Sequence, residues 1–396
     1  MSARAGSLAI WGCVTALFVS GCDKDKPEPP TAPSGALPKA LTGVTLASRN
    51  GFDLALGSDG FELVWGAPPP QEKAQRPGQK SIAVGILSRR FDAGAHAVEE
   101  PRKLFELASG HELGEVEALS LSERLAVGWT ERDASGYEVR GWLGEGETEV
   151  MAPTTLGSNE ASANVRGNLR LLTSRGRPTV FFRGASGDCP TGVASKDERC
   201  AAVQFVSLEP EGPKPRRGPL SVPSPCPAAI VGVSMSDKTW QYALCSWKDG
   251  KVDTTLFSVD FNPQYARAVE LEHGCAPLGA VDAGRDILLG FDCGGTRKLA
   301  VVRDTQVPEP TRDMSDARLG CELGHLTFHA ADFNQVFSEP QRNLEVLLPA
   351  AMQHPGIRAV WTGVSLVMAY PIGNDLMLEA HSCQHGKLLP ASVLSP

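Results

Sequence analysis

The feature that most constrains the fold of this chain is a form that recurs seven times along it. Each copy has a short apolar run, a polar turn and a second apolar run that closes on an aromatic residue. Runs of four to eight residues rich in Val, Leu, Phe and Trp, bounded by Gly, Ser, Asp and Pro, predict β-strands. The second runs are FELVW (61–65), RLAVGW (124–129), TVFF (179–182), WQYALCSW (240–247), ILLGF (287–291), FNQVF (333–337) and SLVMAY (365–370).

Each copy is predicted to contain three or four antiparallel strands. Most second runs have a partner just upstream, such as EALSL (117–121), LRLLT (169–173) and RAVW (358–361). Some copies also contain a fourth run, whose apolar pattern is weaker than that of the other runs. A third run usually follows, and these runs are SIAVGIL (81–87), YEVRGWL (137–143), AAVQFVSL (201–208), DTTLFSVD (253–260), KLAVVRD (298–304), NLEVLLP (343–349) and DLMLEA (375–380).

Seven such units, with an average length of about 50 residues, resemble the blades of a β-propeller. The resemblance implies an all-β fold, and it rests on the form of the repeat and not on a named motif. Near-continuous apolar strands fit it, because neighbouring blades cover both faces of each sheet. Seven blades are predicted, and six blades, eight blades or two β-sandwiches remain open. The run GVTLAS (43–48) is expected to close the ring by pairing with the sheet that ends near Ser382.

The N-terminal region carries a second informative pattern. Leu8 to Val19 is mostly apolar, which is the length of a signal-peptide core and too short to span a bilayer. Val-Ser-Gly-Cys at 19–22 resembles the lipobox of bacterial lipoproteins. The resemblance implies a signal peptide at residues 1–21, cleavage before Cys22 and a thioether-linked diacylglycerol on the Cys22 sulfur. An ordinary secreted protein, in which Cys22 is incidental, is the alternative.

The segment after Cys22 is predicted to be a tether. Residues 23–40 contain five prolines and few bulky apolar groups, so they cannot form a core. A Pro-rich segment of this length would extend for roughly 50 Å. The predicted organisation is therefore a signal peptide (1–21), a lipidated cysteine with a tether (22–40) and a folded domain (41–396). A lipid anchor implies the bacterial cell envelope, with the inner and outer membranes both open.

The charge of the chain disfavours one class of partner. The formal net charge is −8 and the pI is near 5.6, and the sequence has no basic run. Proteins that bind nucleic acids usually present a basic surface. We therefore expect no nucleic-acid partner.

Eight cysteines follow Cys22, and an even number in an exported protein predicts disulfides. In an antiparallel hairpin, facing residues lie at equal distances from the turn. Cys275 and Cys293 are centred on Gly284, and Cys226 and Cys245 are centred between residues 235 and 236, so each pair is predicted to bond. Cys189 and Cys200 flank a polar loop and would close it. Cys321 and Cys383 form the last pair by elimination. Eight free thiols are the alternative.

Four histidines form a candidate metal site. His325 and His329 would share one face of a strand, and so would His381 and His385. A bond between Cys321 and Cys383 would bring the two pairs together, and imidazoles at such spacing can bind a transition metal. Solvated or hydrogen-bonded histidines are the alternative.

No catalytic motif is visible. The stretch HELGE (111–115) lacks the second histidine of a zincin, and no Gly-x-Ser-x-Gly sequence occurs. The sequence therefore favours a non-enzymatic, envelope-anchored scaffold that binds a protein or ligand, without a cofactor. Two long loops, 66–80 and 183–199, are candidate binding segments. The alternative is an envelope hydrolase or lyase that acts on glycans in the channel of the propeller, which would need inward-facing carboxylates or a tyrosine with an acid.

Overall fold

The computed structural model divides the chain into Met1–Lys39 and Ala40–Pro396. The residues that it describes all lie in the second unit. Among these residues, no helix is both long enough and apolar enough to span a membrane. The described residues are 44–69, 83–134, 136–158, 169–174, 176–185, 201–216, 231–234, 239–248, 251–260, 267–283, 286–303, 311–349, 352, 354, 356–384, 387–388 and 392–393.

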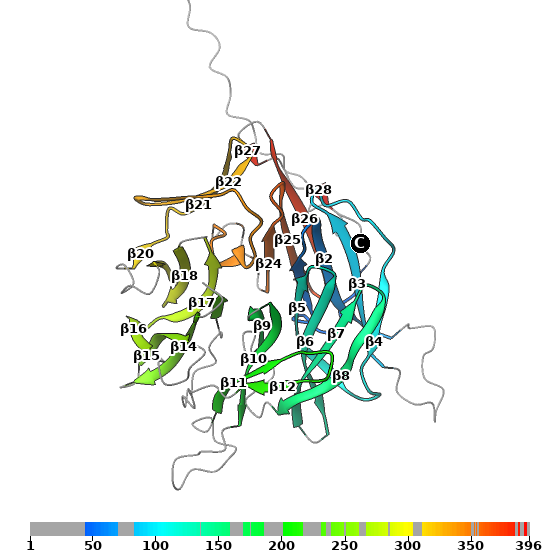
Figure 1. The fold of residues 1–396 in the computed structure, drawn as a ribbon. Helices are drawn as coiled ribbons and strands as arrows, with labels where there is room; N and C mark the ends of the chain where they lie inside the picture. Colours follow the sequence, from blue (N-terminus) through cyan, green and yellow to red (C-terminus); the bar gives the residue numbers. More distant parts are fainter. Residues whose placement is uncertain are drawn as a thin grey trace, which may run out of the picture. The chain divides into compact units, whose positions relative to one another are not determined.

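The described strands form seven antiparallel sheets that follow one another along the chain. Figure 1 shows one of them plainly, with β5, β6, β7 and β8 side by side. The strands of the first three sheets are β1 (Phe52–Leu56), β2 (Gly60–Ala67), β3 (Gly85–Asp92) and β4 (Arg102–Glu106); β5 (Glu112–Leu121), β6 (Arg124–Asp133), β7 (Gly136–Glu145) and β8 (Thr148–Ser158); and β9 (Leu169–Ser174), β10 (Arg177–Ala185), β11 (Ala201–Ser207) and β12 (Lys214–Arg216).

The remaining four sheets include one of three strands and a last sheet with an extra short strand, β28, beside β26. Their elements are β13 (Val231–Ser234), β14 (Thr239–Lys248), β15 (Lys251–Asp260) and β16 (Arg267–His273); β17 (Ala276–Asp282), β18 (Asp286–Cys293), β19 (Thr296–Arg303) and β20 (Arg312–Asp313); β21 (Arg318–Glu322), β22 (His325–Ala330) and β23 (Phe333–Phe337), followed by the 3₁₀ helix η4 (Leu344–Val346); and β24 (Arg358–Trp361), β25 (Ser365–Ile372), β26 (Asp375–Gln384), β27 (Lys387–Leu388) and β28 (Ser392–Val393).

Two of the second strands, β2 and β25, are buried along nearly their whole length, as their apolar sequences predict. Seven of the eight residues of β2 are buried, and so are seven of the eight residues of β25. Each hydrophobic core lies between neighbouring sheets: one joins the first sheet to the last, and another joins the first sheet to the second. Both faces of a sheet are therefore covered, which removes the alternation of an ordinary antiparallel strand.

The first strands of six sheets, together with η4, contact one another in a closed series. Contacts lead from β1 through β5, β9, β13 and β17 to η4, then to β24 and back to β1. Antiparallel sheets arranged around their first strands are the architecture of a β-propeller. The fold class is therefore an all-β propeller. The blade number of seven stays a prediction, because the sixth sheet does not place its own strand in this series.

The prediction of a strand at 343–349 is wrong. Residues 344–346 form η4, and Leu344, Val346, Leu347 and Leu348 are all buried. Val346 packs against Gly279 of β17, where a Cβ atom would lie 2.2 Å from Val346 Cγ1. The apolar run therefore fills the position between β17 and β24. The first strand of the sixth sheet is β21, which the sequence patterns did not predict.

The run at 43–48 pairs with the last sheet, as predicted. Thr45 forms an isolated antiparallel bridge with Asp375, the first residue of β26. The Leu46 N–H donates to the Asn374 carbonyl at 2.7 Å. One residue later, the Ala47 N–H donates to the carbonyl of Gly66 in β2 at 2.8 Å. We call residues 44–47 the terminal clasp, because they join the last sheet to the first.

Candidate functional site

Charged side chains gather where the first elements of several sheets meet. They come from β1, β5, β9 and β24, and from η4 and the turn before it. Most are nearly inaccessible to solvent: Asp53 is 5% exposed, Glu115 2%, Glu117 4% and Arg358 4%. We call this group the inner charge cluster, and its residues are Asp53, Glu115, Glu117, Arg170, Arg342, Glu345 and Arg358.

Arg358 lies among the carboxylates of the cluster. Its Nη2 donates to Glu117 Oε1 at 2.5 Å, and its Nε lies 3.2 Å from Asp53 Oδ1. Glu115 and Glu345 follow at 3.6 and 3.9 Å from the guanidinium. Burial disfavours the charged guanidinium, but the surrounding carboxylates more than offset this and raise the pKa of Arg358. The guanidinium therefore stays charged and joins β24 to β1 and β5.

Two further arginines complete the cluster. Arg170 Nη1 donates to Glu117 Oε1 at 2.5 Å, which joins β9 to β5. Arg342 Nη2 donates to the Ala118 carbonyl at 2.5 Å and lies 3.7 Å from Asp53 Oδ2. The cluster holds four carboxyl groups and three guanidinium groups. One proton on a carboxyl would therefore bring its charge to zero.

Asp53 is a carboxyl of this cluster whose pKa is raised on folding. Burial raises its pKa to about 6, and the carboxylate of Glu117 acts in the same direction. Arg358, Arg342 and the Ala118 N–H, which donates to Asp53 Oδ2 at 2.8 Å, lower the pKa by smaller amounts. At pH values above about 6, Asp53 is therefore mostly ionised, although burial disfavours its negative charge.

This proton gives an expected pH dependence of stability. The pKa of Asp53 is raised on folding, so its contribution to stability is present at low pH and is lost as the pH rises through about 6. We expect the stability of the native chain relative to Asp53→Asn to fall by about 1.4 kcal/mol between pH 5 and pH 7.5. Urea unfolding of both proteins at each pH measures this difference. A difference that is constant with pH would contradict the raised pKa.

An open cleft of about 760 Å³ lies between the first two sheets, away from the inner charge cluster. It is lined by the β1–β2, β5–β6 and β7–β8 turns and by residues that follow β3. In antiparallel sheets of this order, all these connections emerge on one face. The candidate loops 66–80 and 183–199 join second to third strands and lie largely outside the described residues. We call the cleft between the first two sheets the rim cleft.

The lining of the rim cleft is predominantly acidic. Arg102 crosses it: Nη2 bonds Glu62 Oε1 at 3.1 Å and Nη1 donates to the Gly146 carbonyl at 2.6 Å. Arg124 pairs with Glu145 at 2.8 Å. The carboxylates of the lining outnumber the guanidinium groups by six to three; they are Asp59, Glu62, Asp92, Glu99, Glu123 and Glu147, against Arg90, Arg102 and Arg124.

The candidate histidines do not form a metal site in the described part of the chain. There, no three His, Cys, Asp or Glu residues lie close enough together to hold a metal ion. His329 Nδ1 lies 2.6 Å from Asn334 Oδ1, and its Nε2 lies 3.5 Å from Glu322. His381 lies 3.8 Å from Glu379. His325 begins β22, opposite Glu322. His385 lies outside the described residues.

A tyrosine and an acid do meet in the last sheet. The Tyr370 hydroxyl donates to Glu379 Oε1 at 2.7 Å, and the ring of His354 stacks on Tyr370 at 4.0 Å. Burial and the bond to Glu379 raise the pKa of Tyr370, whereas the nearby His381 and the hydrogen bond from Tyr370 lower the pKa of Glu379. Tyr370 therefore keeps its proton at neutral pH and cannot act as a base there.

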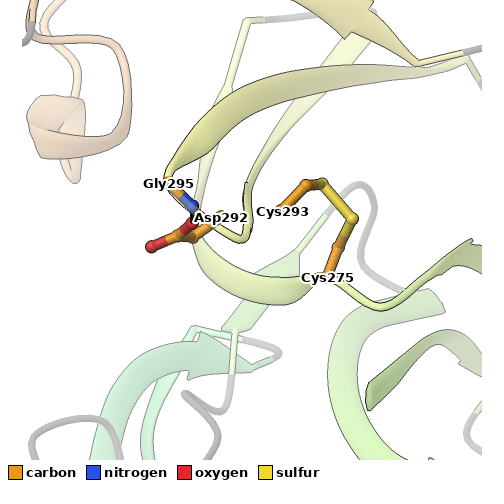
Figure 2. The surroundings of a disulfide bond; sticks show 4 residues. All are labelled: Cys275, Asp292, Cys293 and Gly295. Carbon is orange, nitrogen blue, oxygen red and sulfur yellow. Dashed lines mark hydrogen bonds between the residues drawn. A yellow bond between two sulfur atoms is a disulfide. The ribbon is translucent and has the colours of Figure 1, made fainter. Parts of the chain in front are cut away.

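Two of the predicted disulfides are present. Cys275 is joined to Cys293, as Figure 2 shows, and Asp292 Oδ1 accepts the Gly295 N–H at 2.7 Å in the adjoining turn. Ala276 lies opposite Asp292, so the register of β17 and β18 leads directly to this pair. Cys321 is joined to Cys383, which ties β21 to β26.

The other predicted pairs are not tested by the structure. Cys189, Cys200 and Cys226 lie outside the described residues, and so does Cys22. The hairpin symmetry proposed for Cys226 and Cys245 would place Val231 opposite Trp240, but Val231 lies opposite Ala243. The turn assumed for this hairpin was therefore not its true centre.

The sequence contains a signal that predicts the inner charge cluster. Several first runs carry a single charge inside an otherwise apolar strand: Asp53 in FDLAL, Arg170 in LRLLT and Arg358 in RAVW. A charge in a buried strand requires a partner of opposite sign. First strands of neighbouring sheets supply both signs, so the cluster could have been predicted from these runs.

Comparison with known proteins gives no family: no family model matches the chain, and no curated protein does. Among solved structures, it is similar to the β-propeller domain of the Trilobed protease from Pyrococcus furiosus, with 9% identity over 88% of this chain and 98% of that one, at a TM-score of 0.41. A putative 6-phosphogluconolactonase from Bacteroides fragilis gives 11% identity, 87% and 94% coverage and a TM-score of 0.39.

Prolyl oligopeptidase B from Galerina marginata is a third similar structure, with 9% identity and a TM-score of 0.43. The match covers 90% of this chain but about half, 52%, of the oligopeptidase. Identities and TM-scores this low assign neither a family nor an activity to the chain.

Proposed function

We propose that this protein is a lipoprotein of the bacterial cell envelope whose β-propeller binds a partner and performs no catalysis. The lipobox-like sequence at Val19–Cys22 supports the anchor, and the Pro-rich residues 23–40 support a tether between membrane and propeller. The observation that carries the binding role is the rim cleft, an open volume of about 760 Å³ on a rigid scaffold.

The chemistry of the rim cleft selects the partner. Its guanidinium groups at Arg102 and Arg124 are already paired with carboxylates, whereas Asp59, Glu123 and Glu147 lie exposed on three turns. An acidic cleft attracts cations and repels anions, and such complementarity selects partners and speeds their association. The partner proposed is a protein with an exposed basic segment.

The inner charge cluster supports a structural role over a catalytic one. Its carboxylates lie against guanidinium groups, with Glu117 Oε1 2.5 Å from both Arg170 and Arg358. A carboxylate held in this way is poorly available as a nucleophile or base.

A glycan hydrolase is the second candidate, and one observation favours it. Asp53 has a pKa of about 6 beside the carboxylate of Glu117. Glycosidases use a carboxylic acid of raised pKa together with an ionised carboxylate. The inward-facing acidic cluster that such an enzyme needs is therefore present, although it is buried.

Crosslinking in intact cells tests the proposal. We expect the native chain to capture a specific partner, and Glu123→Lys/Glu147→Lys to lower the yield roughly tenfold because the cleft loses its acidic character. The matched control is Glu112→Lys/Glu339→Lys, which makes the same charge change at exposed positions outside the cleft. Equal yields from the two variants would overturn the assignment to the cleft.

The same cells test the anchor and the second candidate. Cys22→Ala should move the protein from the membrane fraction to the soluble fraction. If no partner is captured, and glycan fragments are released by the native chain but not by Glu117→Gln, the hydrolase is the correct function.

A further inference from the structure

The strand β23 has a free edge within the described part of the chain. It pairs with β22 on one side, and no described strand pairs with the other. The next apolar run, 343–349, would have supplied the missing neighbour, but it lies buried in and around η4 instead. An unpaired edge presents backbone N–H and C=O groups that can pair with another strand.

The register shows which backbone groups point away from β22. Ala330 lies opposite Phe333 across a two-residue turn, and such a turn is closed by a pair that exchanges both hydrogen bonds. The bonding groups of Phe333, Gln335 and Phe337 therefore point toward β22. Those of Asn334 and Val336 point outward. The Val336 carbonyl accepts a hydrogen bond from Gln335 Nε2 at 3.2 Å, and a pairing strand would replace this bond. The side chains of both outward residues are exposed, that of Val336 by 50%.

The sequence of this edge is not protected against pairing. Edge strands usually carry charges, prolines or bulges that prevent association. Phe-Asn-Gln-Val-Phe has no charged residue and no proline, and the described strand pairs with β22 without a bulge. Its sequence is also nearly symmetric about Gln335, with an aromatic residue at each end.

We propose that β23 is an interaction surface for β23 of a second copy of this chain. Antiparallel pairing about a two-fold axis at Gln335 places Asn334 opposite Val336 of the partner subunit, and Val336 opposite the partner's Asn334. These are the residues whose backbone groups point outward, so about four backbone hydrogen bonds form. No like charges face each other, and two-fold pairing is the commonest symmetry of homo-oligomers.

The proposed axis defines a crosslinking test in the full-length chain. Two cysteines at position 335 would face each other with Cα atoms about 4.5 Å apart, which is within disulfide range. We expect Gln335→Cys to form a covalent dimer on mild oxidation, with the bond between residues 335 identified by peptide mapping. Val98→Cys, at a 60% exposed position in the connection between β3 and β4, is the control and should stay monomeric.

A charge exchange tests the register, with each variant made in the Gln335→Cys chain. Asn334→Lys/Val336→Lys places like charges opposite each other and should lower the yield of dimer at least tenfold. Asn334→Lys/Val336→Glu places opposite charges there and should restore the yield. Circular dichroism of both variants checks that they are folded. Absence of the 335–335 bond in the folded Gln335→Cys chain, or equal yields from the two charge variants, would overturn the proposal.

Discussion

Replacement of Arg358 by methionine is expected to lower the free energy of unfolding by about 3–5 kcal/mol, because removal of one partner leaves buried charges uncompensated. Methionine keeps much of the apolar volume of the arginine stem, so the loss reports chiefly on charge. Asp53 and Glu117 are 5% and 4% exposed, and they would remain in the interior without the guanidinium that joins them. Urea-induced unfolding at pH 7.5 measures the change.

Two comparisons separate the buried cluster from ordinary ion pairs. Arg124→Met breaks a pair whose side chains are 45% and 43% exposed, and it should change stability by less than about 1 kcal/mol. Adding Asp53→Asn and Glu117→Gln to Arg358→Met should recover much of the lost stability, because both carboxylates become neutral amides. Equal losses from Arg358→Met and Arg124→Met would mean that the cluster is not a structural centre.

The second large effect is expected from the disulfide between Cys321 and Cys383. The two residues are 62 positions apart, and in the chain-entropy model a loop of that length corresponds to about 4 kcal/mol of stability. Cys321→Ser/Cys383→Ser should lose this amount, because β21 is then held to β26 by noncovalent contacts alone. Thermal and urea unfolding of the oxidised proteins measure the loss.

The shorter disulfide provides an internal comparison. Cys275 and Cys293 are 18 positions apart, so Cys275→Ser/Cys293→Ser should lose about 3 kcal/mol, less than the other pair. Its cysteines already face each other across the β17–β18 hairpin. If this pair contributed the larger share, the order expected from loop length would be wrong.

Much of the fold could be predicted because the signals are local. An apolar run such as SLVMAY and the hairpin symmetry of Cys275 and Cys293 depend on residues that lie close together in the chain, and both predictions agree with the structure. The run NLEVLLP failed because its apolar residues serve a long-range purpose. They fill the space beside Gly279, which is more than sixty residues away in the sequence.

The candidate sites were harder to predict for the same reason. The inner charge cluster forms only when strands separated by as many as 305 residues, those of Asp53 and Arg358, come together. The rim cleft is lined by short turns of ordinary composition, whereas the sequence favoured the long loops at 66–80 and 183–199 as binding segments. Turn length indicates where a chain has freedom, but the open volume is lined by residues of two sheets that meet only in the folded chain.

The terminal clasp has a mechanical consequence. Residues 44–47 bond to the loop and strand of the last sheet on one side and to β2 of the first sheet on the other. A pulling force applied through the N-terminus therefore reaches two sheets at once, and it must shear short rows of hydrogen bonds before it can peel either sheet from its neighbours. Loss of these few residues would remove these backbone bonds, and the two ends of the ring would then be held by the core between the first and last sheets and by the contacts of β1 with β24.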